Sequence, residues 1–500
     1  MRFPPDTEAK IAQIDRFWRQ YRSGLPVETV ITTASEKLGA IDGDVVICGG
    51  TLGLLLGLGL QLRGLQVTII ERGLLQGREQ EWNISRSELQ NLVEAGLLTP
   101  EELAQVIVTE YNPGRVGFRG GTDYWVRDVL NLGVSPRLLL AILKEKLIRS
   151  GGRVQEHCSF TGAVVHPDGV AVHAGECLRA RLLLDCMGYF SPISRQGRHQ
   201  LYGHSRPDSI CMVVGGCAQG LKPCSWGDLL YTFTPIEDNY QYFWEAFPAQ
   251  DGRTTYLFTY SDLHPDRGGF EQLFRVYQRL MPQYQDSDPE TIEFHRILGG
   301  FFPAYRNSPL GAAWDRVLSI GDSGGNQSPL SFGGFGAMVR HLPRLVLGLT
   351  EALEGNHLDR GDLSSLQPYQ PNIGVTWLFQ RVMRVEMGRS VPPDLINRVL
   401  DLVFREMAKL DPLVMKTFLQ DVVQFSALTQ TMAAMAIADP LLIARVVGLV
   451  GAGALGSWLG HYSLLGGYEL LRKLPASRDF RGRRQWEAWS FGAGHDRLAA

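Results

Sequence analysis

The stretch that most constrains the fold is residues 44–72, which read DVVICGGTLGLLLGLGLQLRGLQVTIIER. Residues 45–47 are typical of a buried strand, a helix is expected at about 54–63, and 67–70 are expected to form a second strand. A strand, a glycine turn, a helix, a strand and a terminal acid in this order match the βαβ unit of dinucleotide-binding folds. The sequence therefore predicts an α/β fold with a Rossmann-type nucleotide domain.

The residue types of this unit suit contact with a dinucleotide. Gly50 lets the backbone approach a pyrophosphate, Gly53 lets the helix pack close to the strand, and the helix N-terminus favours negative charge. Glu71 can accept ribose hydroxyls and disfavours a 2′-phosphate, which favours FAD or NAD over NADP. Cys48 stands where the first glycine of G-x-G-x-x-G is usual, so the turn is expected to differ slightly. The candidate binding residues here are Gly49, Gly50, Gly53, Glu71 and Arg72.

Composition excludes several classes of protein. The chain has 500 residues, long enough for several folding units, and a net charge of −3, which gives no nucleic-acid signature. Its seven cysteines form no C-x-x-C pair and no zinc pattern, so we expect reduced thiols in a cytosol-like compartment and no metal. The first residues, MRFPPDTEAK, lack the apolar core of a secretory signal.

Residues 77–88 combine polar and aromatic side chains before a predicted helix. Ser85 and Glu88 form an S-x-x-E capping box, which explains Ser85 without any function. Arg78 and Arg86 are candidates for neutralising cofactor phosphate or the anion of a flavin ring. Further along, an apolar strand at 181–185 ends in DCMGYFS, which predicts a second turn beside the nucleotide or, alternatively, an ordinary exit from a strand.

A late motif favours FAD over NAD. Residues 317–320 are expected to form a buried strand, and Asp322 follows it, where a carboxylate can accept a ribityl or ribose hydroxyl. A glycine-rich bend then leads into a long apolar helix at about 335–353, whose N-terminus can stabilise negative charge on a flavin. Enzymes that have only an NAD-binding domain do not need this late acid, glycine bend and helix. The candidate FAD-binding residues outside the first unit are Arg86, Asp185, Gly188, Gly321, Asp322, Gly333, Gly334, Phe335 and Gly336.

Residues 208–300 are rich in β-branched and aromatic side chains and predict a mostly antiparallel substrate domain. Within YFWEAFP, alternation places Phe243, Glu245 and Phe247 on one face of a strand. A carboxyl between phenyl rings is paired or has a raised pKa, and the second case suits a general acid. The alternative is a surface strand with Glu245 in solvent or in a salt bridge.

Both ends of the chain carry apolar segments beside basic residues. An amphipathic helix within residues 1–43 is expected to dock on the core or, alternatively, to touch a membrane. Residues 446–468 hold no charge except a possible one at His461, are long enough to span a bilayer, and precede a run of arginines and lysines. We expect this segment to contact a membrane, in one leaflet rather than across it; the alternative is a buried helical hairpin.

The sequence thus predicts five parts. A helical extension occupies 1–43, the first part of the FAD domain 44–207, the substrate β domain 208–300, the second part of the FAD domain 301–360, and a helical, membrane-associated region 361–500.

The motifs together resemble a known family. GGTLG, GREQEWNISR, YFWEAFP, FPAYRNSPL, IGDSGGNQSPLSFGGFG and NIGVTWLFQR are similar to segments of the CruA/CruP-type lycopene cyclase group of cyanobacteria and plastids, most closely its CruP branch. The resemblance covers most of residues 40–430. It implies a two-dinucleotide-binding-fold flavoprotein like p-hydroxybenzoate hydroxylase, with FAD, a carotenoid substrate, and a peripheral or monotopic place on the cytoplasmic side of a thylakoid or plasma membrane.

The resemblance also implies a chemistry. Plant-type lycopene cyclases have an F-L-E-E-T segment that supplies an essential acid, and YFWEAFP is similar to it with one acid, Glu245, in place of two. Phe243, Trp244 and Phe247 would then contact the substrate. The alternatives are a flavin-dependent carotenoid oxidoreductase or monooxygenase with an electron donor and a photoprotective role, and a non-catalytic flavin or carotenoid carrier.

Overall fold

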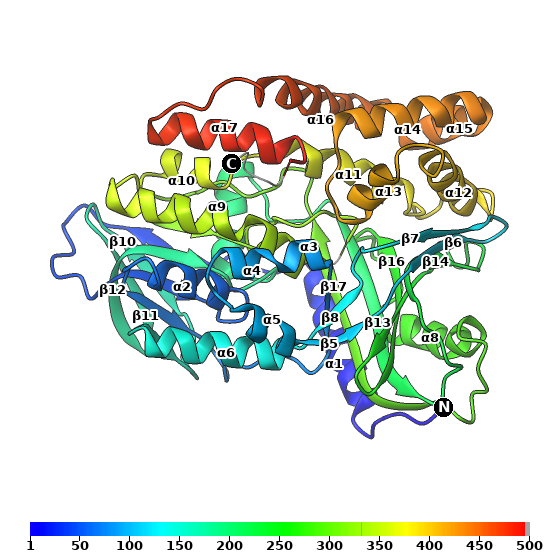
Figure 1. Ribbon diagram of the computed structural model, residues 1–500, viewed down its shortest axis with the longest axis horizontal. Helices are drawn as coiled ribbons and strands as arrows, with labels where there is room; N and C mark the ends of the chain where they lie inside the picture. Colours follow the sequence, from blue (N-terminus) through cyan, green and yellow to red (C-terminus); the bar gives the residue numbers. More distant parts are fainter. Residues whose placement is uncertain (332, 496–500) are drawn as a thin grey trace.

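The predicted βαβ unit forms two neighbouring strands of the first sheet, next to β12 (Glu176–Asp185). A computed structural model describes residues 1–331 and 333–495 (Figure 1). In it β2 (Gly43–Cys48), α2 (Gly53–Gln61) and β3 (Val67–Ile70) follow the predicted order. The eight-stranded sheet has the order β1-β10-β11-β12-β2-β3-β9, with β18 paired to β12. Its other strands are β1 (Ile31–Thr33), β9 (Arg153–Gln155), β10 (Gly162–Val165), β11 (Val170–Ala174), β12 (Glu176–Asp185) and β18 (Val317–Ser319).

Three parallel strands of this sheet end at the same edge. Asp185 at the end of β12 is paired with Cys48 of β2 on one side and with Ser319 of β18 on the other. The chain segments that follow, residues 49–53, 186–191 and 320–325, therefore leave the sheet side by side. Ligands of open α/β sheets bind at this carboxyl edge.

Helices cover the eight-stranded sheet and bury its apolar core. The helix α2 packs against α6 (Pro136–Arg149) and α9 (Gly334–Glu354), and the outer helices α10 (Arg360–Leu366) and α17 (Phe480–Gly492) pack against α9. A small three-stranded sheet, β4-β8-β5, lies nearby. The remaining elements of this half are β4 (Trp82–Ile84), β5 (Ile107–Glu110), β8 (Leu132–Val134), α3 (Arg86–Leu89), α4 (Asn91–Glu94), α5 (Pro100–Val106) and α7 (Pro192–Tyr202).

The predicted antiparallel sheet is present but larger than the sequence indicates. Its seven strands have the order β17-β13-β16-β15-β14-β6-β7. The strands β6 and β7 lie within 44–207, outside the predicted 208–300, and join through a parallel pairing of β6 with β14 that no local pattern announces. The strands are β6 (Gly114–Phe118), β7 (Asp123–Val126), β13 (Ser209–Gln219), β14 (Gly227–Thr232), β15 (Phe243–Ala249), β16 (Gly252–Ser261) and β17 (Glu293–Ala304).

Different helices cover the two faces of the seven-stranded sheet. One face carries α8 (Phe270–Tyr284) and the N-terminal helix α1 (Thr7–Ser23), which docks on the core: Trp18 is completely buried against Phe270 and Phe301. The opposite face is covered by α12 (Leu395–Met407) and α13 (Pro412–Leu419), whose apolar residues share one cluster with the sheet. The site described below lies on this second face.

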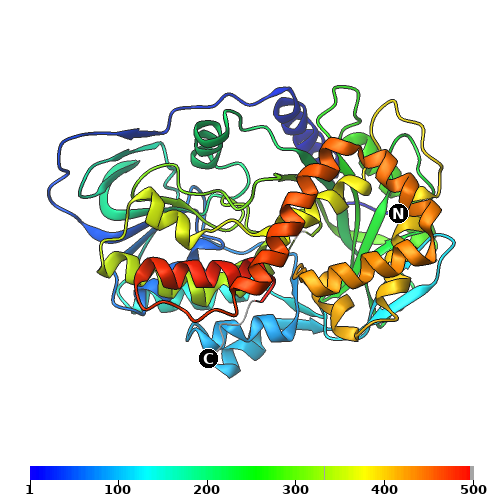
Figure 2. The same ribbon diagram turned by 90° about the horizontal axis from the view of Figure 1, so that it is seen from above.

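The C-terminal helices form an outer layer (Figures 1 and 2). It contains α14 (Phe425–Ala438), α15 (Pro440–Val450) and α16 (Ala452–Leu471), and α16 packs on the largely buried helix α11 (Pro371–Val382). The predicted apolar segment 446–468 is not one helix, because the chain breaks at Gly451, where φ is +84°. Among the described residues no single helix is long and apolar enough to cross a membrane; α14 and α15 together meet that test but are bent by 115°.

Candidate active site

The first glycine turn forms as predicted. Cys48 does not take part in the turn, because it is the last residue of β2. Its side chain lies in the core, and the left-handed residue is the next one, Gly49, at φ +95°. A Cβ on Gly49 would lie 2.4 Å from the Cys186 carbonyl oxygen, and one on Gly53 would lie 2.8 Å from Ile47. Only glycine therefore allows β2, α2 and the 186–191 segment to meet this closely.

Glu71 lies on this turn. Its carboxylate accepts hydrogen bonds from the Gly50 backbone N–H at 2.8 Å and from the Gly73 N–H at 3.3 Å. A Cβ on Gly50 would lie 1.7 Å from Leu75, so the packing of Leu75 leaves no room for a side chain at this position. Arg72 is exposed next to Glu71. The arrangement is that of a ribose-binding acid at a nucleotide turn.

Asp185 lies at the same edge of the sheet, but its carboxyl is taken up by hydrogen bonds to other groups of the protein. It is completely buried and accepts five hydrogen bonds, from the Met187 N–H and from the hydroxyls of Ser191, Ser194, Ser319 and Ser323. Burial raises its pKa, and these donors oppose the rise. This corrects the expectation of direct cofactor contact: Asp185 ties the ends of β12 and β18 together, and its lone pairs are occupied.

Asp322 is the open carboxylate of the site. It follows Gly321, at φ +67°, and its Oδ1 is buried with no hydrogen-bond partner among the described residues. Burial raises its pKa to about 6, against the opposing effects of Arg78 and the Tyr189 hydroxyl. An unpartnered buried acceptor is costly unless a ligand supplies a donor. Its position fits the predicted bond to a cofactor hydroxyl.

Gly188 holds the neighbouring turn against the Asp322 segment. Its φ is +80°, its N–H donates to the Ser323 hydroxyl at 2.8 Å, and a Cβ there would meet no atom within 4 Å. Position 188 favours glycine because its φ is positive, since an added Cβ would meet only open space.

The glycine bend leads into α9 as predicted. Gly333 caps the helix, and a Cβ on Gly334 would lie 2.4 Å from the Asp322 Oδ1, so the helix N-terminus comes directly against that carboxylate. A Cβ on Gly336 would lie 3.7 Å from Glu88. Phe335 is different: its ring stacks on Trp82 at 4.6 Å and is 6% exposed. Its backbone belongs to the bend, whereas its side chain packs in the core.

The two candidate arginines have different surroundings. Arg86 pairs with Glu110 at 2.7 Å, and both side chains are about half exposed (54% and 52%). This corrects its assignment to the cofactor, because its charge is neutralised at the surface. Arg78 instead acts on Asp322, whose pKa it lowers. Arg78 is thus a basic residue close enough to act on the carboxyl edge of the eight-stranded sheet, where residues 49–53, 186–191 and 320–325 meet (the cofactor edge).

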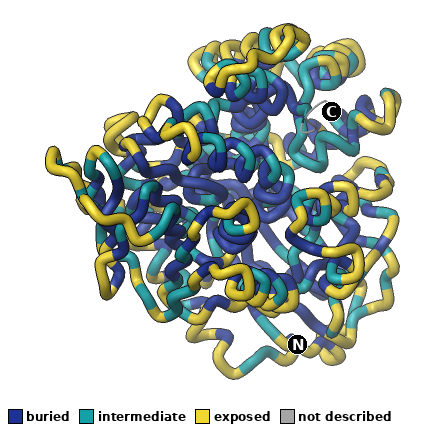
Figure 3. Tube along the Cα trace, turned by 60° about the vertical axis from the view of Figure 1, so that its left-hand side comes forward, coloured by how far each residue is buried: buried dark blue, intermediate teal, exposed yellow. Residues whose placement is uncertain are grey.

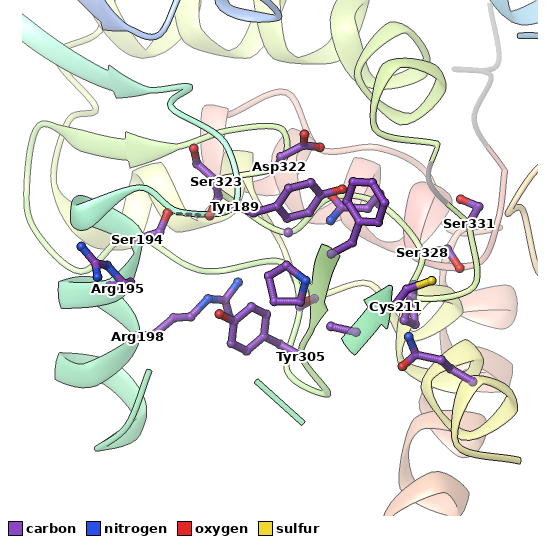
Figure 4. A pocket seen from close by; sticks show the side chains of 18 residues that line it. Tyr189, Ser194, Arg195, Arg198, Cys211, Tyr305, Asp322, Ser323, Ser328 and Ser331 are labelled. Carbon is purple, nitrogen blue, oxygen red and sulfur yellow. Dashed lines mark hydrogen bonds between the residues drawn. The ribbon is translucent and has the colours of Figure 1, made fainter. Parts of the chain in front are cut away.

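A pocket, partly open to solvent, connects the cofactor edge with the seven-stranded sheet. Asp322 and Tyr189 line it from the cofactor edge, Cys211 from the sheet, and Ser328 and Ser331 from the loop that precedes α9 (Figure 4). A group bound at Asp322 would therefore lie next to the sheet face that carries the candidate acid.

The predicted alternation in β15 is confirmed. Phe243 and Phe247 belong to the apolar cluster beneath α12 and α13. Phe243 packs against Phe258 at 5.4 Å, and Phe247 lies 5.8 Å from Tyr111. Glu245 lies between them on the same face.

Trp244 lies on the opposite face of the strand. It is completely buried, and its ring stacks on Tyr284 at 4.6 Å and on Tyr277 at 5.8 Å under α8. It is therefore a core residue beneath the sheet, which corrects its assignment to the substrate. Only Phe243 and Phe247 of the three predicted aromatic contacts face the side of Glu245.

Glu245 is an acid without a partner. Among the described residues no side chain or backbone group forms a hydrogen bond or ion pair with its carboxyl, and it is paired across the strands with Tyr256. Burial, with the neighbouring Asp421 carboxylate as the second cause, raises the pKa of Glu245 to about 8. At neutral pH this carboxyl holds a proton in an apolar setting, as a general acid must.

Asp421 is a residue that the sequence does not single out. It follows α13, almost 180 positions from Glu245, and its carboxyl accepts a hydrogen bond from the Ser331 hydroxyl. Its positive φ of +61° is unusual for a residue with a side chain. No spacing rule connects two such segments, so only the structure shows that they meet.

No family model and no curated protein matches the chain. A geranylgeranyl bacteriochlorophyll reductase-like protein from Thermoplasma acidophilum superposes with a TM-score of 0.60 at 14% identity, over 83% of this chain and 99% of that one. The halogenase PltM in complex with phloroglucinol and FAD gives 0.55 at 12% identity, over 91% and 97%. The fold is that of the FAD-binding flavoproteins. A third similar structure is the Diels-Alderase PyrE3, with a TM-score of 0.51 at 18% identity over 76% and 80%.

Proposed function

We propose that this protein is an FAD-dependent enzyme that modifies a carotenoid, most specifically a lycopene β-cyclase-like enzyme that closes a ring without net oxidation or reduction. The observation that carries the proposal is Glu245: an unpartnered, protonated carboxyl between Phe243 and Phe247, on the sheet face whose Cys211 lines the pocket at the cofactor edge. The motifs that resemble the CruA/CruP-type group support the substrate class.

FAD fits the residues of the cofactor edge. Glu71 beside the glycine turn would hold the adenosine ribose, and the N-terminus of α2 would receive the pyrophosphate. The unpartnered Oδ1 of Asp322 would accept a ribityl hydroxyl, and Arg78 would balance negative charge. The flavoprotein fold supports this assignment.

Ring closure of an acyclic carotenoid end is an isomerisation. The Glu245 O–H bond breaks as its proton adds to the terminal alkene, and a ring closes through a tertiary cation. A carbon next to the cation then loses a proton to the Glu245 carboxylate, so that the acid is restored and no electrons are gained or lost. Phe243 and Phe247 would stabilise the cation through their faces and exclude the water that would trap it. FAD, bound in its reduced form, would supply negative charge beside the cation.

Two other functions stay open as alternatives. The same site with an electron donor and oxygen would oxidise or reduce a polyene, in which case Glu245 is dispensable and the flavin redox state turns over. The second alternative is a carrier that binds pigment without converting it.

The deciding assay is anaerobic incubation of lycopene with the purified protein and chemically reduced FAD, followed by pigment analysis. We expect products with β-rings and no net consumption of reduced flavin. Unchanged lycopene, together with oxygen uptake in the presence of cyclic carotenoids, would contradict the cyclase and support the oxidative enzyme. Unchanged pigments that stay bound to the protein would support the carrier.

We also propose that the outer helical layer contacts a membrane from which the apolar substrate is drawn. Ile437 and Leu441 flank the bend between α14 and α15 and are each 83% exposed. The same layer exposes Val447, Leu459, Leu464, Leu470, Leu471 and Leu474. Its outer side is exposed in Figure 3, and Arg445, Lys473 and Arg478 are exposed beside these side chains. Apolar side chains flanked by basic ones suit an anionic bilayer surface.

Replacing Ile437 and Leu441 together by serine should weaken binding to vesicles of phosphatidylglycerol and phosphatidylcholine by at least about tenfold, because each side chain would lose roughly 1.5–3 kcal/mol of burial. Sedimentation with vesicles measures the binding. A control that replaces Leu62 and Leu138, exposed residues of α2's end and α6, should bind like the parent protein. Equal binding by the first variant would disprove the role of this bend.

A further inference from the structure

Asp421 brings a second carboxyl to the candidate site from the C-terminal region. Its carboxyl accepts the Ser331 hydroxyl hydrogen bond, and a Cβ on Gly333 would lie 3.5 Å from its Oδ2. Both contacts belong to the loop that lines the pocket and begins α9. The carboxyl is therefore fixed against the same loop that adjoins the cofactor edge.

The backbone around Asp421 is anchored from two sides. The Gln420 side-chain amide donates to the Ser85 hydroxyl at 2.8 Å. Arg340 of α9 donates to the Gln420 carbonyl and pairs with Glu88 at 2.9 Å. These bonds attach the end of α13 to α3 and α9, so the position of Asp421 is set by the cofactor-binding half of the protein.

Tyr260 connects the loop with the sheet at this point. Its hydroxyl donates to the Leu330 carbonyl at 2.5 Å, and it lies on the face of β16 that carries Phe258 and, one strand away, Phe243. Burial is the main cause that raises the pKa of the Tyr260 hydroxyl, and the nearby carboxyls of Glu245 and Asp421 raise it further. The two carboxyls therefore face one space, Glu245 from the sheet and Asp421 from the end of α13, where it bonds to Ser331 next to Leu330.

We propose that Asp421 is the positioning partner of Glu245: a fixed negative charge, delivered by the C-terminal region, that keeps the proton on Glu245 until substrate takes it. This rests on the proposed role of Glu245 as the acid. When Glu245 has given up its proton, two neighbouring carboxylates share an apolar space. Their repulsion favours return of a proton to Glu245, which prepares the site for another turnover.

The two groups ionise in the order that this role requires. Burial raises the pKa of Asp421 to about 6, while Ser331, Arg340 and Ser328 lower it and Glu88 raises it. Glu245 ionises later, near 8, and faces Tyr256 and Tyr260 of β16, Cys211 of β13 and Tyr111. Between about pH 6 and 8 the pair holds one proton, and it resides on Glu245.

The test is a carboxyl titration by infrared or ¹³C NMR spectroscopy of the full-length protein, which does not need turnover. Comparison with Glu245→Gln identifies the Glu245 signal. In Asp421→Asn its midpoint should fall by about one pH unit, a tenfold larger acid dissociation constant, because the neighbouring charge is gone. Asp266→Asn, an exposed carboxyl of the same domain, is the matched control and should leave the midpoint unchanged.

An unchanged Glu245 midpoint in a folded Asp421→Asn protein would overturn the proposal. Asp421→Glu keeps the charge and should hold the midpoint near the parent value; a fall equal to that of the asparagine variant would also overturn it. Failure of the cyclase assay with the expected titrations would leave the acid pair intact and reject only the proposed reaction. The two conclusions are thus tested separately.

Discussion

Glu245→Gln is expected to lose ring formation almost completely while the protein keeps its fold and its flavin. Glutamine has nearly the same shape and fills the space between Phe243 and Phe247, but it cannot donate a proton to an alkene. General acids contribute about 10²–10⁴-fold to rate, so β-ring product in the anaerobic lycopene assay should fall at least a hundredfold. Flavin absorbance and thermal unfolding of the purified variant would show that the site is otherwise intact.

The pH dependence of the parent enzyme supplies the control for this prediction. An acid whose pKa is raised to about 8 is protonated below that pH and loses its proton above it, so kcat/KM should be level near pH 7 and fall as the pH rises past 8. Glu293→Gln removes an exposed carboxyl of β17 and should leave activity and profile unchanged. Normal product yield from Glu245→Gln would remove Glu245 from the mechanism and favour the oxidative alternative.

Local patterns predict the cofactor edge well, because its main parts are short in sequence. The βαβ unit at 44–72, the cap at Ser85, the helix after Ser135 and the bend before α9 all appear within a few residues of their expected places. Each depends on contacts between near neighbours: glycine at a positive φ, a capping side chain, or a buried run of apolar residues. The position of Asp322 just beyond β18 follows from the same local reasoning.

The same kind of motif misleads when distant residues decide its role. Asp185 and Asp322 both follow a buried strand, so sequence reads them alike. The structure separates them, because Ser319 and Ser323, more than 130 positions away, occupy the lone pairs of Asp185. Arg86 likewise looks like a cofactor contact until Glu110 is found beside it. Which partner reaches a charged side chain is a property of the tertiary fold.

Contacts between segments far apart in the sequence also explain which features around the seven-stranded sheet local patterns do not predict. Alternation assigns the faces of β15 correctly, and the packing of Trp244 under α8 follows from that rule once α8 is in place. The parallel pairing of β6 with β14 and the arrival of Asp421 beside Ser331 involve segments separated by about a hundred residues or more, and carry no local signal. The C-terminal region therefore contributes to the site as well as to the outer surface.

Gly49→Ala should destabilise the protein far more than Gly188→Ala, although both glycines have positive φ at the same sheet edge. At Gly188 the added Cβ meets open space, so the cost is that of a left-handed alanine, about 1–2 kcal/mol. At Gly49 the Cβ would also lie 2.4 Å from the Cys186 carbonyl oxygen, a backbone atom that cannot turn aside. We expect a loss of about 4 kcal/mol there.

Urea unfolding of the flavin-free proteins measures both changes on one scale, because the comparison then contains no contribution from ligand binding. Flavin content after purification should fall with stability in Gly49→Ala, since the same displacement separates β2 from the 186–191 segment and opens the turn that carries Gly50. Equal losses in the two variants would mean that the edge relaxes around an added methyl group. The close approach of β2 and β12 would then not be what fixes the cofactor turn.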